Sequence, residues 1–240
     1  GTLYGAAFTD SALYTINLET GAPTKVGDLG DAFDVMDLTI HPNGNMYGID
    51  RTGAIFQIDP KTAKATLVVK ISGFTKPMGL GFDADGTGYV VDLVPQAPVY
   101  RIDLTTGQIT GTVKTTLNNL HSAEIMVTPP PRSAGPLIYS TADDGALLVT
   151  IDFATGETKV IGPTGQISAS GLACDGAGTL YTFTHAFDTT GESQLAKLDL
   201  TTGEARPYGE KNSLQFMGLT FTPDGTLYAA GFTDGALYTI

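Results

Sequence analysis

The sequence contains a unit that recurs from one end of the chain to the other, and this repetition constrains the fold more than any other feature. The first sixteen residues read GTLYGAAFTDSALYTI and the last sixteen read GTLYAAGFTDGALYTI, so the two strings differ at only three positions, all of them small residues. Weaker copies begin at Gly44, Gly86 and Gly178. A period of about 40 residues is the signature of repeat architectures in which neighbouring units bury one another. We therefore expect a single domain over residues 1–240.

Each unit contains four short segments typical of β-strands, separated by turn signals. In the unit that starts at Pro77 the segments are PMGLGFD, TGYVVDL, VYRIDL and QITGTVKT. An Asp-Gly turn follows the first segment and a Thr-Gly turn follows the third. Alternating apolar and polar residues between such turns predict antiparallel hairpins. Four-stranded units in series predict an all-β fold, a β-propeller of four-stranded antiparallel blades.

The first strand of each unit is expected to lie nearest the propeller axis, where blades crowd together. Gly79, Gly171 and Gly218 occur there, and a glycine allows two backbones to approach closely. The chain begins with a second strand and ends after a third strand, so the number of blades does not follow directly from the repeats. We favour six blades, with five as the alternative. The likeness of the two ends would also allow chains to exchange their terminal hairpins.

The pattern GLxFDxDGTLY…LYxIDxxTG, found over essentially the whole chain, resembles the repeats of exported bacterial β-propellers. It is also similar to the repeats of the NHL and gluconolactonase-like group of six-bladed propellers. The resemblance implies a scaffold whose members range from lactonases and esterases to pure binding modules. The composition is rich in Gly, Thr and Asp and poor in Lys and Glu, which favours a secreted or periplasmic protein. No signal peptide is visible, so we expect an export signal that has been removed.

The charge of the chain excludes several classes of partner. The formal net charge is −12, whereas proteins that bind nucleic acid or anionic membrane surfaces present basic patches. No apolar run reaches the roughly 18 residues that a membrane-spanning helix needs. Cys174 is the only cysteine, so no disulfide can form within the chain, and we expect it to be a small buried residue.

Two acidic residues stand where other units have glycine at the axis, and they are the candidate metal ligands: Asp37 and Glu124. The adjoining loops supply four polar residues as candidate ligand-binding residues: Asp34, Asn118, Asn119 and His121. Carboxylate and amide oxygens are the ligands that Ca²⁺ or Mg²⁺ prefers, so one reading is a divalent cation at the mouth of the channel. The other reading is that the carboxylates accept hydrogen bonds from backbone amides or water.

The gluconolactonase-like resemblance implies a metal held by one Glu, two Asn and one Asp at such central positions. Glu124 matches the Glu and Asp37 matches the Asp. The corresponding points of the remaining first strands carry Gly rather than Asn. The carboxylates therefore match the family pattern only in part.

No nucleophile–base pair or redox motif is visible in the sequence. We predict a monomeric, non-enzymatic scaffold that binds a small molecule, a glycan or a protein through its loop-rich face, with no cofactor other than Ca²⁺ or Mg²⁺. The alternative is a metal-dependent hydrolase or lactonase that uses Asp37 and Glu124.

Overall fold

The computed structural model describes residues 3–6, 12–16, 23–32, 34–125, 137–166, 169–175, 177–184, 194–208, 211, 216–221, 227–231 and 237–239. Their strands form six antiparallel sheets, four with four strands and two with three.

The two three-stranded sheets come from the ends of the chain: β1 (Leu3–Ala6), β2 (Ala12–Ile16) and β3 (Pro23–Asp28); and β20 (Phe216–Phe221), β21 (Leu227–Gly231) and β22 (Leu237–Thr239). The four-stranded sheets lie between them in sequence and are β4 (Val35–Ile40), β5 (Met46–Asp50), β6 (Ala54–Ile58) and β7 (Ala65–Lys70); β8 (Pro77–Phe82), β9 (Gly88–Asp92), β10 (Pro98–Asp103) and β11 (Gln108–Lys114); β12 (Glu124–Ile125), β13 (Leu137–Ala142), β14 (Leu147–Asp152) and β15 (Thr158–Pro163); and β16 (Ser170–Cys174), β17 (Leu180–Thr184), β18 (Gln194–Leu198) and β19 (Ala205–Pro207).

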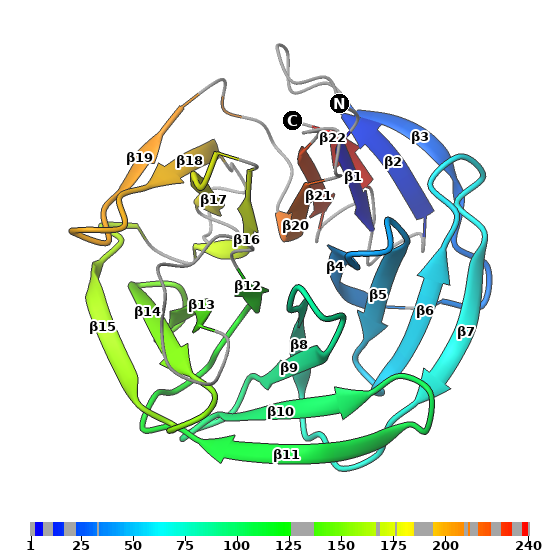
Figure 1. Cartoon of the computed structure of the whole chain (residues 1–240). Coiled ribbons are helices and arrows are strands. Elements are labelled where there is room, and N and C mark those ends of the chain that lie inside the picture. Colours follow the sequence, from blue (N-terminus) through cyan, green and yellow to red (C-terminus); the bar gives the residue numbers. More distant parts are fainter. Residues whose placement is uncertain are drawn as a thin grey trace.

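The sheets stand around a common axis, as predicted for a propeller (Figure 1). The strands β4, β8, β12, β16 and β20 lie nearest the centre, and β3, β7, β11, β15 and β19 lie at the outer rim. In each four-stranded sheet the strands pair in chain order, so each blade is an antiparallel meander running from the axis to the rim. The first strand of each repeat is therefore the inner strand.

The number of complete blades differs from the prediction. The structure has four four-stranded blades, whereas the sequence favoured six, with five as the alternative. The difference lies in the two terminal groups of strands, β1–β3 and β20–β22, in each of which the structure describes three strands. Each group pairs within itself as a three-stranded sheet.

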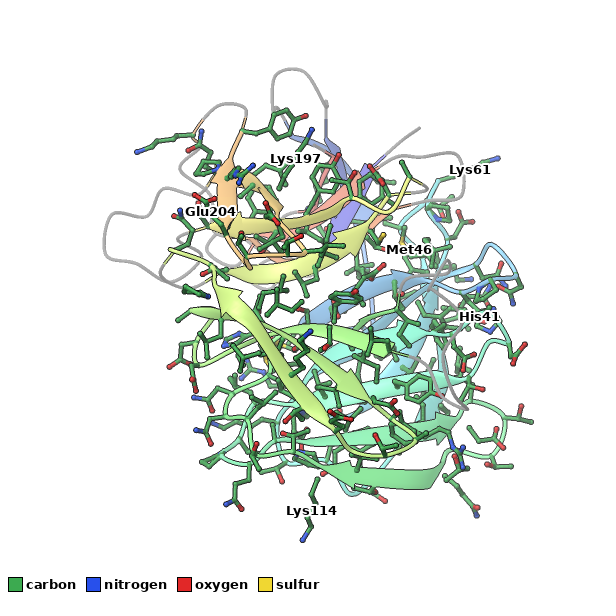
Figure 2. The ribbon with its side chains drawn as sticks, turned by 60° about the vertical axis from the view of Figure 1, so that its left-hand side comes forward. His41, Met46, Lys61, Lys114, Lys197 and Glu204 are labelled. Atoms are coloured by element: carbon green, nitrogen blue, oxygen red, sulfur yellow. The ribbon has the colours of Figure 1, made fainter. Side chains whose placement is uncertain are left out.

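Apolar residues cover both faces of the blades because each blade packs against a neighbour on either side. Val90 of β9 packs with Ile49 and Ile55 of the preceding blade. The adjacent Val91 packs with Ile138 of the following blade. Side chains fill the spaces between the sheets, whereas Lys61 and Lys114 point away from the molecule (Figure 2).

The Asp and Gly of the repeated motif form the turn between the third and fourth strands. Asp103 Oδ1 accepts hydrogen bonds from Thr105 N at 2.7 Å and Thr106 N at 3.2 Å. Gly107 N donates to Asp103 O at 2.9 Å, and Gly107 has a φ of +70°, which glycine adopts without steric cost. The motif is thus a hairpin signal. Among the described residues no helix is long and apolar enough to cross a membrane.

Candidate functional site: the channel carboxylates and the neighbouring loops

Asp37 lies on the inner strand β4 and joins two blades. Its side chain is buried, with 4% of its surface exposed. Asp37 Oδ1 accepts a hydrogen bond from its neighbour Leu38 N, and Oδ2 accepts one from Leu80 N of β8, both at 2.9 Å. Burial raises the pKa of Asp37 well above its usual range, although the two N–H donors act in the opposite direction. The carboxyl group therefore serves as a buried acceptor between blades.

Glu124 stands at the equivalent position of β12 and makes a similar link. Its Oε1 accepts a hydrogen bond from Cys174 N of β16 at 3.2 Å. Burial raises the pKa of Glu124 to about 8. Burial is the largest cause of the raised pKa of Asp37, and the negative charge of Glu124 adds to it as the smallest.

The glycine at the same repeat position in β8 has a different role. A Cβ atom on Gly79 would lie 2.6 Å from Ala123 N, which is the backbone of the next blade. The prediction of close backbone approach is confirmed at this glycine. Gly171 of β16 has a φ of +67°, so its backbone conformation is a separate reason for glycine there. Gly218 lies on β20, but its burial is not among the features that the structure describes.

Asn118, Asn119 and His121 lie together in the segment between β11 and β12. Asn118 Oδ1 accepts a hydrogen bond from Gln96 N at 3.0 Å, and Asn118 O accepts one from Asp143 N at 3.1 Å. Asn119 Nδ2 donates to Asp144 Oδ1 at 3.2 Å. These bonds connect three loops, and we call residues 94–96, 118–121 and 143–144 the loop cluster.

His121 is the buried member of the loop cluster. Its side chain is 4% exposed, and its Nε2 lies 3.6 Å from Asp144 Oδ1, whose side chain is 72% exposed. Burial lowers the pKa of His121, while the negative charge of Asp144 raises it. The next residue, Ser122, has a buried Oγ without a hydrogen-bond partner among the described residues.

The loop cluster also contains left-handed backbone at residues other than glycine. The four positions, with φ between +50° and +56°, are Gln96, Asn119, Asp143 and Asp144. Such backbone is strained, and it persists where surrounding contacts hold it, often at functional sites. The sequence pointed to these loops as part of the loop-rich face but did not reveal Gln96, Asp143 or Asp144 as members of one cluster. Three of the four are Asn or Asp, which tolerate this conformation best, and that is the only sequence signal.

Asp34 does not belong to the loop cluster. It precedes β4 with a φ of +57°, and its Oδ2 lies 2.7 Å from Arg51 Nε. Burial raises the pKa of Asp34 and the Arg51 guanidinium lowers it. The predicted ligand-binding residues thus divide between two places in the molecule.

The described residues do not supply a complete set of metal ligands. Among the described residues no three His, Cys, Asp or Glu side chains form a group that could hold a metal ion. Both oxygens of Asp37 and one oxygen of Glu124 accept backbone hydrogen bonds. These hydrogen bonds agree with the alternative interpretation of Asp37 and Glu124, in which the two side chains accept hydrogen bonds from backbone amides.

The fold and these contacts define the class as an all-β propeller. No known protein family profile matches the chain, and no curated protein matches it in sequence. Solved structures do match in shape. The nidogen/laminin complex is similar with a TM-score of 0.60 and 15% identity, over 96% of this chain and 86% of that chain.

Hydrazine synthase of Kuenenia stuttgartiensis is similar with a TM-score of 0.53 and 16% identity, over 84% of this chain. The similarity spans only 56% of the hydrazine synthase chain. At these identities the two likenesses establish the propeller fold and carry no activity to this chain.

Proposed function

We propose that this protein is a non-catalytic propeller scaffold that binds its ligand through the loop cluster. The observation that carries the proposal is the concentration of left-handed, hydrogen-bonded backbone at Gln96, Asn119, Asp143 and Asp144. Rigid scaffolds commonly place binding residues on such loops. Apart from Pro95, the exposed side chains there are amides and carboxylates, which suit a ligand rich in hydroxyl or N–H groups, such as a glycan.

A glycan array probed with the labelled protein tests this proposal. The variant that combines Asn118→Ala with Asp144→Ala should lose the bound signals. Asp85→Ala is the matched control, because Asp85 is an exposed acidic residue in the β8–β9 turn, at the other end of β9 from the β9–β10 loop that holds Gln96. Array signals that survive the double substitution, or that depend on Asp85, would contradict a site at the loop cluster.

A metal-dependent hydrolase or lactonase is the second candidate, favoured by the placement of two carboxyl groups, Asp37 and Glu124, on the inner strands β4 and β12. Those two side chains would provide oxygen ligands, and Ca²⁺ or Mg²⁺ would supply a Lewis acid. A ligand that binds only the folded chain raises its melting temperature. The second candidate therefore requires a rise with millimolar Ca²⁺ or Mg²⁺ that Asp37→Asn with Glu124→Gln abolishes, together with hydrolysis of a test lactone.

Three further predictions from the sequence are also part of this proposal: the likeness to NHL and gluconolactonase-like repeats, export from the cell, and a monomeric state.

For the ring we propose five positions around the axis rather than six. Support comes from β20, which lies directly against both β16 and β4, so that β4, β8, β12, β16 and β20 follow one another around the centre.

A further inference from the structure

The two ends of the chain carry the same hairpin twice. The hairpins β1–β2 and β21–β22 have nearly the same sequence, and they also have the same register. Tyr4 lies opposite Thr15 in the first hairpin, and the equivalent Tyr228 lies opposite Thr239 in the second. The next two residue pairs of the two hairpins are matched in the same way. The hairpins are therefore equivalent in backbone pairing as well as in sequence.

Both hairpins occupy the same sector of the ring. The strand β1 lies against its equivalent β21, and β2 lies against its equivalent β22 (Figure 1). The inner circle leaves no place for a further first strand there, because β20 lies directly against β4. Two copies of one structural element thus lie where a single blade would take one.

Among the strands that the structure describes, those that would flank such a hairpin are each present once. The inner strand β20 pairs with β21, and it also lies against β1. The outer strand β3 pairs with β2, and it also lies against β22. A complete four-stranded blade could therefore be β20–β1–β2–β3 or β20–β21–β22–β3. In both arrangements the hairpin between the two strands has the sequence GTLYxAxFTDxALYTI.

We propose that β20 and β3 form a hairpin-binding site that either end of the chain can fill. Its ligand is a two-stranded peptide of this sequence, bound by main-chain pairing on both edges, as in the addition of strands to an open sheet. Because the two hairpins differ only at small residues, they compete on nearly equal terms. This inference rests on the five-position ring proposed above and not on the glycan-binding proposal.

Matched proline substitutions in the full chain test the redundancy of the two hairpins. Tyr4→Pro and Tyr228→Pro each place a residue without an N–H in the equivalent strand of one hairpin. Each single variant keeps one intact hairpin, so its melting temperature should fall by less than about 5 °C. The double variant should fall by more than twice the sum of the single losses, or lose its cooperative transition. Single losses that simply add, or a single variant that fails to fold, would overturn the proposal.

A synthetic peptide tests the site directly. The peptide with the sequence of residues 225–240 should restore the transition of the double variant or raise its melting temperature by several degrees. The same peptide with Tyr228→Pro is the control and should have no effect. Equal effects of the two peptides, or no effect of either, would mean that β20 and β3 do not form such a site. Since the readout is stability, it is independent of the outcome on the glycan array.

Discussion

Asp37 Oδ2 on β4 accepts a 2.9 Å hydrogen bond from Leu80 N on β8, so the carboxyl group joins the inner strands of neighbouring blades. Glu124 joins β12 to β16 in the same manner through Cys174 N. Between these two links, Gly79 allows β8 and β12 to approach without any side chain. The residue at this repeat position thus connects neighbouring inner strands in one of two ways: a carboxyl group accepts a hydrogen bond from the next strand, or a glycine allows the two backbones to pack closely.

Asp37→Ala should lower the free energy of unfolding by about 1–3 kcal/mol, because it leaves a buried backbone N–H of Leu80 without its acceptor. Asp37→Asn keeps one acceptor oxygen and should lose less. Urea unfolding followed by fluorescence or circular dichroism measures both variants. The exposed Asp31→Ala is the control and should stay near the wild type. An equal loss from Asp31→Ala and Asp37→Ala would argue against the bridge.

Stability should fall as the pH rises from about 4.5 to about 8, because the pKa of Glu124 is raised from 4.5 to about 8 in the folded chain. In that window the folded chain binds a proton that the unfolded chain has lost, so ionisation favours unfolding. The contribution of this group is at most about 1.4 kcal/mol per pH unit. Asp37 acts in the same direction because its pKa is also raised.

The matched variant for this pH dependence is Glu124→Gln, which removes the titrating group and keeps an acceptor oxygen. Its unfolding free energy should vary less with pH than that of the wild type between pH 5 and 8, as measured by urea unfolding at several pH values. Parallel pH profiles for the two proteins would contradict the assignment of the dependence to Glu124.

The sequence predicted the structural features that recur in every repeat, but it did not predict the contacts that are specific to particular loops. Period-two alternation and Asp-Gly turns are local signals, so the strand order and the inner place of Asp37 followed from them. The loop cluster depends on bonds such as Asn119 Nδ2 to Asp144 Oδ1, between residues far apart in the chain, and no local pattern encodes them. The blade number was predicted wrongly for a related reason: β20 pairs with β21 and β3 pairs with β2, so the two similar hairpins belong to separate sheets, and no local pattern encodes this.

Gly79→Ala should destabilise the protein by about 1–3 kcal/mol, because the added methyl group would meet the backbone of Ser122 and Ala123, which cannot turn aside as a flexible side chain could. Gly111→Ala is the matched control on the outer strand β11, where an added Cβ would lie at an ordinary 3.4 Å from Phe153 Cζ. We expect Gly111→Ala to change stability by less than about 0.5 kcal/mol. Thermal and urea unfolding compare the two, and similar losses would show that β8 and β12 can separate at little cost.

His121 should titrate below its usual range, because burial disfavours the imidazolium more than Asp144 favours it. Asp144→Asn removes the negative charge that lies 3.6 Å from His121 Nε2 and should therefore lower the pKa of His121 further. NMR titration of the imidazole protons measures the shift, with Asp85→Asn as a distant acidic control that leaves the midpoint unchanged. An unchanged midpoint in Asp144→Asn would mean that this contact does not govern His121, and the loop cluster would lose its link between the buried imidazole and the exposed carboxylate.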